Sequence, residues 1–255
     1  ALTLTQGSGA NVIIAAGQTK IVATDGGGSG AIVYEMDDLE LAGNLTVTGV
    51  LDVDGTANLD VIDVDGAANF AADVTFAEDI ITATAGTSNV RLGVNAGNSI
   101  VSGGNYNVVV GEEAGTALTT GDNNVAIGFE ALKTEDAHGS NTAVGYRALK
   151  TLNAGAEAYN VAVGVDAGLS ATTGVRNVLL GAFAGDALTN ADFNIAVGSK
   201  ALGADTLGSA SVAIGHGALE VQNFTTATTS YNVAVGHNAG VAVTTGVENT
   251  LIGSL

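Results

Sequence analysis

Residues 123–150 read NNVAIGFEALKTEDAHGSNTAVGYRALK and contain nearly the same phrase twice. Residues 124–128, Asn-Val-Ala-Ile-Gly, return 17 positions later as residues 141–145, Asn-Thr-Ala-Val-Gly. A repeat at a fixed period is the signature of a stacked repeat architecture, and missing it would lead to a wrong fold. The recurrence of this phrase along the chain therefore decides the architecture.

The phrase occurs ten times, and the commonest spacing between copies is seventeen positions, lengthened in three places by insertions. The closing glycines are Gly93, Gly111, Gly128, Gly145, Gly164, Gly181, Gly198, Gly215, Gly236 and Gly253. The opening residues are Asn89, Asn107, Asn124, Asn141, Asn160, Asn177, Asn194, Asn232 and Asn249, with Ser211 in the remaining phrase. The fourth residue after the closing Gly is Gly or Leu in alternating pairs, for which the sequence alone offers no reason.

The phrase has the pattern of a short strand. Aliphatic residues such as Val125 and Ile127 stand two apart, which places both side chains on one face. Stacked repeats then form a parallel β-roll or β-helix with turns about 4.8 Å apart. We expect each Asn to bond amide to amide with the Asn of the next turn, and each Gly to form a tight corner. Both columns are therefore interpreted as architectural.

The number of chains follows from the small size of one repeat. Two or three buried aliphatic side chains stabilise a turn by less than the ordering of its whole backbone costs. Burying the Val and Ile face against identical chains around a threefold axis removes this shortage. The sequence therefore predicts a homotrimer.

The composition argues against several functions. The 255 residues include no Cys, Pro or Trp, and 26 acidic against seven basic residues give a formal net charge of −19. Because phosphate binding depends on clustered Lys and Arg, we expect neither nucleic acid nor an anionic membrane surface as a partner. No apolar run is long enough for membrane insertion, and no pattern indicates a cofactor. The chain starts at Ala1 and stops directly after a repeat phrase, so we expect a longer protein to continue at both ends.

The first 88 positions follow other periods. Residues 43–76 alternate apolar and polar side chains between glycines, with recurrences at every sixth and every eleventh position. This predicts short strands with glycine turns. We expect three segments, which are a β-rich segment for attachment or shaft over 1–42, an acidic intertwined β shaft over 43–88, and the repeat β-roll domain over 89–255. The predicted fold is an all-β, elongated homotrimeric fibre.

The phrase NVAIGxxAL, preceded by NLTVTGxLDVDG, resembles tail fibres and related virion fibres of tailed bacteriophages, particularly marine ones. Residues 211–215, Ser-Val-Ala-Ile-Gly, are similar to the head repeats of trimeric autotransporter adhesins, which form a left-handed parallel β-roll. The resemblance covers residues 43–255, although the repeat is longer here than in those heads. It implies a trimeric virion fibre outside the cell, in contact with other tail proteins and with a host glycan or receptor.

Two sets of residues are candidates for metal binding. His216 and His237 both follow a closing Gly, so six imidazoles would gather in a trimer. Rings of carboxylates about a threefold axis could bind a hard cation through oxygen. The acidic candidates are Asp52, Asp54, Asp63 and Asp65. Exposed corner histidines and outward-facing charges explain both sets without a metal, and we predict no metal site there.

Catalysis would need paired carboxylates, because some β-helical phage proteins cleave polysaccharides. Glu112, Glu113 and Glu130 follow closing glycines in neighbouring repeats, but Arg147 and Asp166 continue the same stack. This mixed stack of charges fits a solvated charge ladder equally well. We therefore predict no enzymatic activity.

Receptor contact is expected either at the insertions over 151–159 and 220–231, where added length is tolerated on the outside of the fold, or at a tip beyond the C-terminal end of this sequence. Aromatic side chains there and at corners are candidates for stacking on sugars. These are Tyr106, Tyr146, Tyr159, Phe224 and Tyr231.

Three functions remain open on the sequence. The first is a non-enzymatic trimeric fibre of a phage virion, in which rigidity and reach are the function. The second is the head of a bacterial trimeric surface adhesin, which a translocation signal or an outer-membrane anchor would favour. The third is a polysaccharide depolymerase, which turnover of a host glycan would reveal.

Overall fold

The computed structural model describes residues 2–4, 12–14, 22–24, 33–35 and 85–254. These residues form strands and turns and contain no helix, so the described part of the chain is all-β, as predicted. The chain divides into two compact units, Ala1–Asp73 and Val74–Leu255. In the first unit, β1 (Leu2–Leu4) pairs antiparallel with β2 (Val12–Ile14), and β3 (Val22–Thr24) pairs antiparallel with β4 (Val33–Glu35). Residues 43–84 of the predicted shaft lie outside the described residues.

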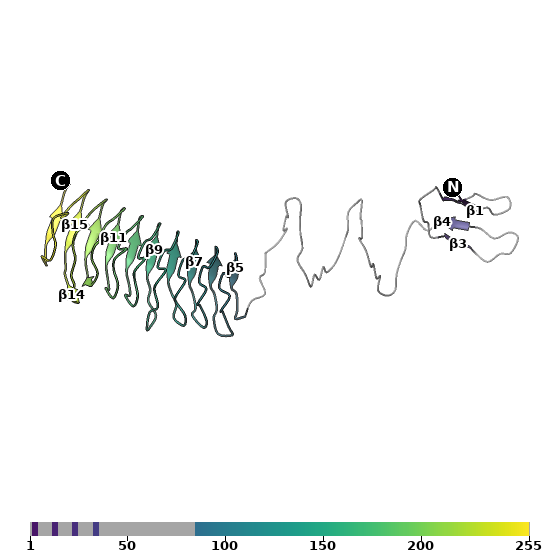
Figure 1. Ribbon diagram of the computed structural model, residues 1–255, viewed down its shortest axis with the longest axis horizontal. Coiled ribbons are helices and arrows are strands. Elements are labelled where there is room, and N and C mark those ends of the chain that lie inside the picture. Colours follow the sequence, from purple (N-terminus) through teal and green to yellow (C-terminus); the bar gives the residue numbers. More distant parts are fainter. Residues whose placement is uncertain (1, 5–11, 15–21, 25–32, 36–84, 255) are drawn as a thin grey trace. The chain divides into compact units, whose positions relative to one another are not determined.

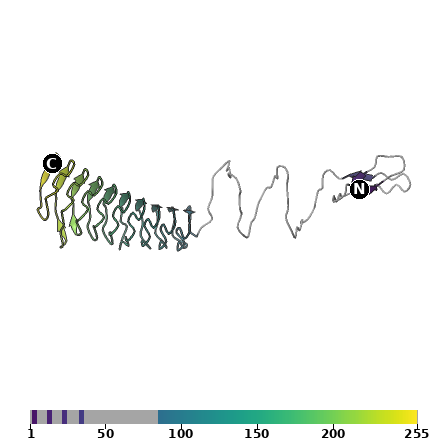
Figure 2. The same cartoon turned by 45° about the horizontal axis from the view of Figure 1, so that its top comes forward.

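In the second unit, residues 85–254 form a parallel β-solenoid of ten turns (Figure 1). Each turn contributes one short strand to a single parallel sheet, and Figure 2 shows these strands stacked along one side of the turns. In chain order the strands are β5 (Val90–Leu92), β6 (Val108–Val110), β7 (Val125–Ile127), β8 (Thr142–Val144), β9 (Val161–Val163), β10 (Val178–Leu180), β11 (Ile195–Val197), β13 (Val212–Ile214), β15 (Val233–Val235) and β16 (Thr250–Ile252). A second parallel pair joins β12 (Gly208–Ser209) to β14 (Thr228–Thr229).

The strands pair in register, so equivalent residues of successive turns stack on one another. Ala126 of β7, for example, lies opposite Ala143 of β8. Because side chains alternate along a strand, the middle residue of each three-residue strand points to one face and its two neighbours to the other. Ala126 is fully buried, whereas Ile127 is 36% exposed. The aliphatic face expected from the repeat is therefore the outer face of the sheet in a single chain.

The interior of the solenoid is a continuous core of small and aliphatic side chains. Most turns contribute the middle strand residue and the Ala three positions after the closing Gly, such as Ala126 and Ala131. Larger side chains come from the fourth or seventh position after that Gly, as in Leu132 and Leu118. One chain thus buries more apolar surface than the count of aliphatic residues in the phrase indicated.

The column of asparagines is buried, but its bonding differs from the expected ladder. Asn124 Oδ1 accepts a hydrogen bond from the backbone N–H of Asn141 at 3.1 Å, one turn later. Asn107 Nδ2 donates to the carbonyl oxygen of Gly121 at 2.8 Å. Among the described residues, the side-chain amides of two asparagines bond to each other at only two steps, Asn177 to Asn160 and Asn249 to Asn232. The amides instead satisfy backbone groups at the corner, because buried N–H and C=O groups need partners.

The glycine corners are confirmed by their backbone conformation. Gly111 has a φ of 127°, and a Cβ built on it would lie 2.7 Å from the carbonyl oxygen of Gly128. The corner residues of successive turns therefore approach too closely for any side chain, and the conformation favours Gly as well.

The exceptional Ser211 has a compensating partner. Gln222 extends from the seventh position of the same turn and donates from Nε2 to Ser211 Oγ at 3.0 Å. The Gln222 Oε1 atom accepts a bond from Asn232 Nδ2 at 2.8 Å. The longer Gln222 side chain thus links the asparagine column across the turn that lacks an Asn.

Candidate functional site

The outer face of the ten-stranded sheet is apolar from its first strand to its last. It is formed by the first and third residues of each strand, and eighteen of these 20 positions are Val, Ile or Leu, the other two being Thr142 and Thr250. Along the middle of the sheet, Ile127, Val163 and Ile195 are 36–39% exposed. Aliphatic side chains that continue over several turns and remain open to water are typical of an interaction surface.

Aromatic and cationic side chains form columns at the two corners beside this outer face. The rings of Phe129 and Tyr146 stack with their centroids 5.4 Å apart. On the other corner, the guanidinium carbon of Arg176 lies 5.9 Å from the ring centre of Tyr159 and 5.4 Å from that of Phe193. Stacking across turns therefore holds these exposed side chains in fixed columns.

The carboxylates considered for catalysis belong to a charge ladder. Lys133 bridges Glu113 and Glu130, and Lys150 pairs with Glu130 at 2.6 Å. Hydrogen bonds from Lys133 and Lys150 lower the pKa of Glu130. A glycosidase needs one carboxylic acid with a raised pKa, so Glu130 is not tuned for that role.

The same stack continues with an ion pair between Arg147 and Asp166. Arg147 donates from Nε and Nη2 to the two carboxylate oxygens of Asp166, at 2.8 and 2.7 Å. This two-bond pairing raises the pKa of Arg147. The expected ladder of charges is present as ion pairs along the stack. It is less solvated than expected, because Glu130 and Asp166 are only 8% and 5% exposed.

The structure brings His216 and His237 together. Their rings stack with centroids 5.3 Å apart on neighbouring turns, and both residues are exposed. The four aspartates proposed as alternative cation ligands, Asp52, Asp54, Asp63 and Asp65, lie outside the described residues.

The candidate sugar-stacking residues differ in their exposure. Tyr159 and Tyr231 are 52% and 61% exposed, so their rings are accessible. Phe224 is only 6% exposed, because its ring packs over Gly208 of the preceding turn. The expectation that Phe224 contacts a receptor is therefore wrong for the folded chain.

Two buried carboxylates were missed by the sequence reasoning. Glu135 and Asp205 occupy the seventh position after a closing Gly, where the neighbouring turns hold Leu118, Leu152 and Leu188. The turn that follows each of these residues contains an insertion, and each carboxylate accepts a hydrogen bond from the backbone of that following turn. Glu135 accepts it from Ala154 N, and Asp205 accepts it from Phe224 N. Burial raises the pKa of Glu135. The signal that could have revealed them is an acid in an otherwise apolar column.

Glu135 also belongs to a group of metal-ligand types. One carboxylate oxygen of Glu135, one of Asp136 and one ring nitrogen of His138 lie within 4.8 Å of one another. Glu135 is fully buried, whereas Asp136 and His138 are half-buried. All three come from one short segment between β7 and β8.

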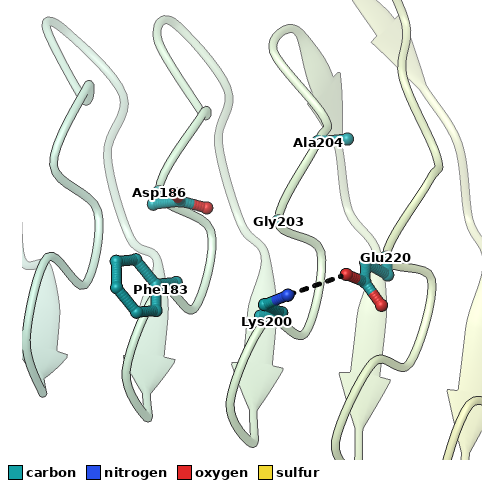
Figure 3. A pocket seen from close by; sticks show the side chains of 6 residues that line it. All are labelled: Phe183, Asp186, Lys200, Gly203, Ala204 and Glu220. Atoms are coloured by element: carbon teal, nitrogen blue, oxygen red, sulfur yellow. Dashed lines mark ion pairs between the residues drawn. The ribbon is translucent and has the colours of Figure 1, made fainter.

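A hollow of about 300 Å³ lies on the surface between the turns of β10, β11 and β13 (Figure 3). Its lining residues are Phe183, Asp186, Lys200, Gly203, Ala204 and Glu220. Lys200 forms an ion pair with Glu220 at 3.6 Å, while burial raises the pKa of Asp186. An aromatic ring, two carboxylates and one ammonium group around a hollow of this size could hold a small polar molecule.

Comparison with known proteins gives no relative. No family model matches the chain, and neither a curated protein nor a solved structure matches it. In the described parts of the chain, no helix has the length and hydrophobicity that a membrane crossing requires.

Proposed function

We propose that this chain is a structural fibre protein of a bacteriophage virion and that it assembles as a homotrimer through the outer face of its solenoid. The observation that carries the proposal is the exposure of that face, where Ile127, Val163 and Ile195 are 36–39% accessible in a single chain. Apolar surface on this scale is unfavourable in water, and a partner that covers it would stabilise the fold.

A second copy of the same chain fits this surface in two respects. Its aliphatic columns have one side chain per turn at the strand spacing of about 4.8 Å, so another copy offers the same spacing. The outward strand positions include no Asp, Glu, Lys or Arg. Identical faces therefore meet without like-charge repulsion at their centre, even though the chain has a net charge of −19.

The threefold form and the virion are supported by the resemblance of the NVAIG phrases to trimeric fibres of tailed bacteriophages. In this proposal the stacked turns act as a rigid spacer between tail proteins and the host surface. The insertions over 151–159 and 220–231 are the candidate contacts with a host glycan, and Tyr159 and Tyr231 expose their rings there.

Light scattering on the purified chain tests the assembly. The trimer should have three times the chain mass of 24.9 kDa. The double variant Val163→Lys/Ile195→Lys places two ammonium groups on the outer face and is expected to give a folded 24.9-kDa monomer. The matched control is Ala156→Lys, which adds a charge to an exposed insertion and should leave the trimer intact. A wild-type chain that is folded and monomeric would disprove the trimer.

The virion assignment is tested separately by immunogold labelling with an antibody against residues 89–255. Label on the tail appendages of purified particles supports a virion fibre. Label on the bacterial envelope instead would contradict it and favour a surface adhesin.

A further inference from the structure

The segment Glu135–His138 has features that its neighbours in the solenoid lack. The equivalent positions of the flanking turns, Leu118 and Leu152, are fully buried and apolar, so Glu135 places a carboxylate in an aliphatic column. A buried carboxylate is unfavourable unless it is paired or coordinates a cation. The contacts of this one group therefore show whether a ligand is needed.

The backbone contacts of Glu135 leave part of its capacity unused. Oε1 accepts a hydrogen bond from His138 N at 3.3 Å, and Oε2 accepts one from Ala154 N at 3.0 Å. An ionised carboxylate has about four acceptor positions. Each oxygen thus retains a lone pair after these bonds are made.

The imidazole of His138 faces the same carboxylate. His138 Nδ1 is buried and lies 3.5 Å from Glu135 Oε1, yet among the described residues it has no hydrogen-bond partner. Two lone-pair atoms at this separation repel each other unless a proton or a cation lies between them. A tetrahedral zinc ion with bonds of about 2.0–2.1 Å separates its ligand atoms by about 3.3 Å, which is close to the observed distance.

Asp205 provides a contrast within the same chain. It occupies the equivalent buried position of another turn, and its Oδ1 accepts bonds from Gly208 N and Phe224 N. Its Oδ2 accepts a third bond, from Gln222 Nε2 at 2.6 Å. A neutral amide donor thus completes the Asp205 site, whereas at Glu135 the corresponding place is taken by the unpaired ring nitrogen of His138.

We propose that Glu135, Asp136 and His138 bind one divalent transition-metal ion of the zinc type in each chain. Asp136 is half-buried, and one of its carboxylate oxygens lies within 4.8 Å of the other two ligand atoms. Two carboxylates and a neutral imidazole carry a charge of −2 and match a dication, and mixed nitrogen and oxygen ligands suit zinc. Water would complete the coordination.

The site would act on the neighbouring turn. Since Glu135 also holds the backbone of Ala154, a bound metal would fix the carboxylate that anchors the insertion over 151–159. The ion would therefore serve as a clip between a corner segment and an insertion. All ligands come from one chain, so the site does not depend on the proposed trimer.

Zinc binding by the full chain tests the proposal. The protein is stripped with EDTA, exchanged into metal-free buffer and titrated with Zn²⁺ by calorimetry, with Co²⁺ absorption as a second readout. The wild type is expected to bind one Zn²⁺ per chain and to show the visible bands of tetrahedral Co²⁺. His138→Gln and Glu135→Gln should each weaken binding at least about tenfold, since losing even an outer partner of a ligand costs about 10- to 100-fold.

The control is the double variant His216→Gln/His237→Gln, which removes the exposed histidine pair and should bind Zn²⁺ as the wild type does. Glu135→Gln keeps an acceptor for Ala154 N, and His138→Gln changes a half-buried side chain, so circular dichroism should confirm that both variants fold. The proposal is overturned if the wild type binds no Zn²⁺, or if both single variants bind it unchanged. Loss of binding in the histidine-pair variant alone would also overturn it.

Discussion

Leu179 occupies the space that a side chain at position 185 would need. A Cβ atom on Gly185 would lie 2.8 Å from Leu179 Cδ2 and equally close to Leu188 Cδ1 of its own turn. In turns whose middle strand residue is Ala, such as Ala126, the fourth position after the closing Gly can hold a leucine, here Leu132. The middle strand residue and the fourth residue after the closing Gly thus border the same part of the core, and a large side chain at either position fills it.

This shared volume explains the alternation of Gly and Leu along the repeat. The turn of Ala162 and Gly168 is small at both positions, and leucines of the two flanking turns fill it. A Cβ on Gly168 would lie 2.8 Å from both Leu149 Cδ2 and Leu179 Cδ1. Gly240 lies in the same way between Leu219 and Leu251. A leucine therefore fills core space in a neighbouring turn as well as in its own turn.

A swap between strand and corner should restore packing. Leu179→Ala is expected to lower the free energy of unfolding by about 2–5 kcal/mol through the cavity it leaves. Gly185→Leu should cost about 1–3 kcal/mol by overpacking. The double variant reproduces the Ala126–Leu132 arrangement and should be more stable than the sum of the two changes predicts. Urea denaturation of the four proteins measures this coupling.

The control for this cycle pairs Leu179→Ala with Leu118→Ala. These residues are four turns apart, so their effects should add. Simple additivity in the Leu179–Gly185 cycle as well would show that the two positions do not share a volume.

The corner glycines should be far more sensitive than glycines of the insertions. Gly164 has a φ of 143°, and a Cβ on it would lie 2.5 Å from the carbonyl oxygen of Gly181. Gly164→Ala is expected to cost at least about 1–3 kcal/mol from backbone strain, with the clash in addition. Gly155→Ala, whose Cβ would have nothing within 4 Å, should change stability by at most about 0.5 kcal/mol. Equal melting temperatures for the two variants would contradict the close stacking of corners.

The asparagine column should contribute strongly to stability. Asn177 Oδ1 accepts a bond from Asn194 N at 3.0 Å, and Asn177 Nδ2 donates to Ala191 O at 2.8 Å. Asn177→Ala leaves both backbone groups without these partners, at about 1–3 kcal/mol each. Chemical denaturation should therefore show a loss of several kcal/mol. The exposed Asn153 serves as the control, and an equally small effect at both positions would rule out this role for the column.

The charge ladder predicts a pH dependence. Because Lys133 and Lys150 lower the pKa of Glu130 below its ordinary value of 4.5 in the folded state, the unfolded chain binds this proton more readily. The stabilisation by Glu130 is therefore fully present above about pH 4.5 and is lost as the pH falls through the lower folded pKa. Glu130→Gln should reduce the melting temperature only modestly at pH 7, since Lys133 and Lys150, the partners of the buried Glu130, are 32% and 29% exposed and water weakens both ion pairs.

The same comparison at low pH and at high salt provides the check. Below the folded pKa the difference between the wild type and Glu130→Gln should vanish, and at pH 7 salt should reduce it. A difference that grows on acidification would mean that the pKa of Glu130 is raised rather than lowered.

Much of the fold could be predicted from the repeat because its determinants are local. The regular spacing of the closing glycines gives the number of turns, and the Val-x-Ile alternation gives the strands. Gly111 and its equivalents are required by the conformation of their own backbone. The architectural role of the asparagines was also correct, although their partners are mostly backbone groups rather than other amides.

The site residues could be predicted only in part, because their environment depends on neighbouring turns. Tyr159 and Tyr231 are exposed as the insertions suggested, whereas Phe224 is buried over Gly208. Glu135 and His138 look like ordinary polar loop residues until the stack places Glu135 in the column of Leu118 and Leu152.

The sequence by itself thus determined the period, the strand positions and the all-β class of the described chain, since these follow from spacing along one backbone. Only the tertiary structure decided which face of each strand is inside and which turns share core volume, as Leu149 and Leu179 do around Gly168. It also placed the carboxylate of Glu135 beside the imidazole of His138. The physical reason is that packing and pKa depend on the side chains stacked one turn above and below, and one repeat does not specify them.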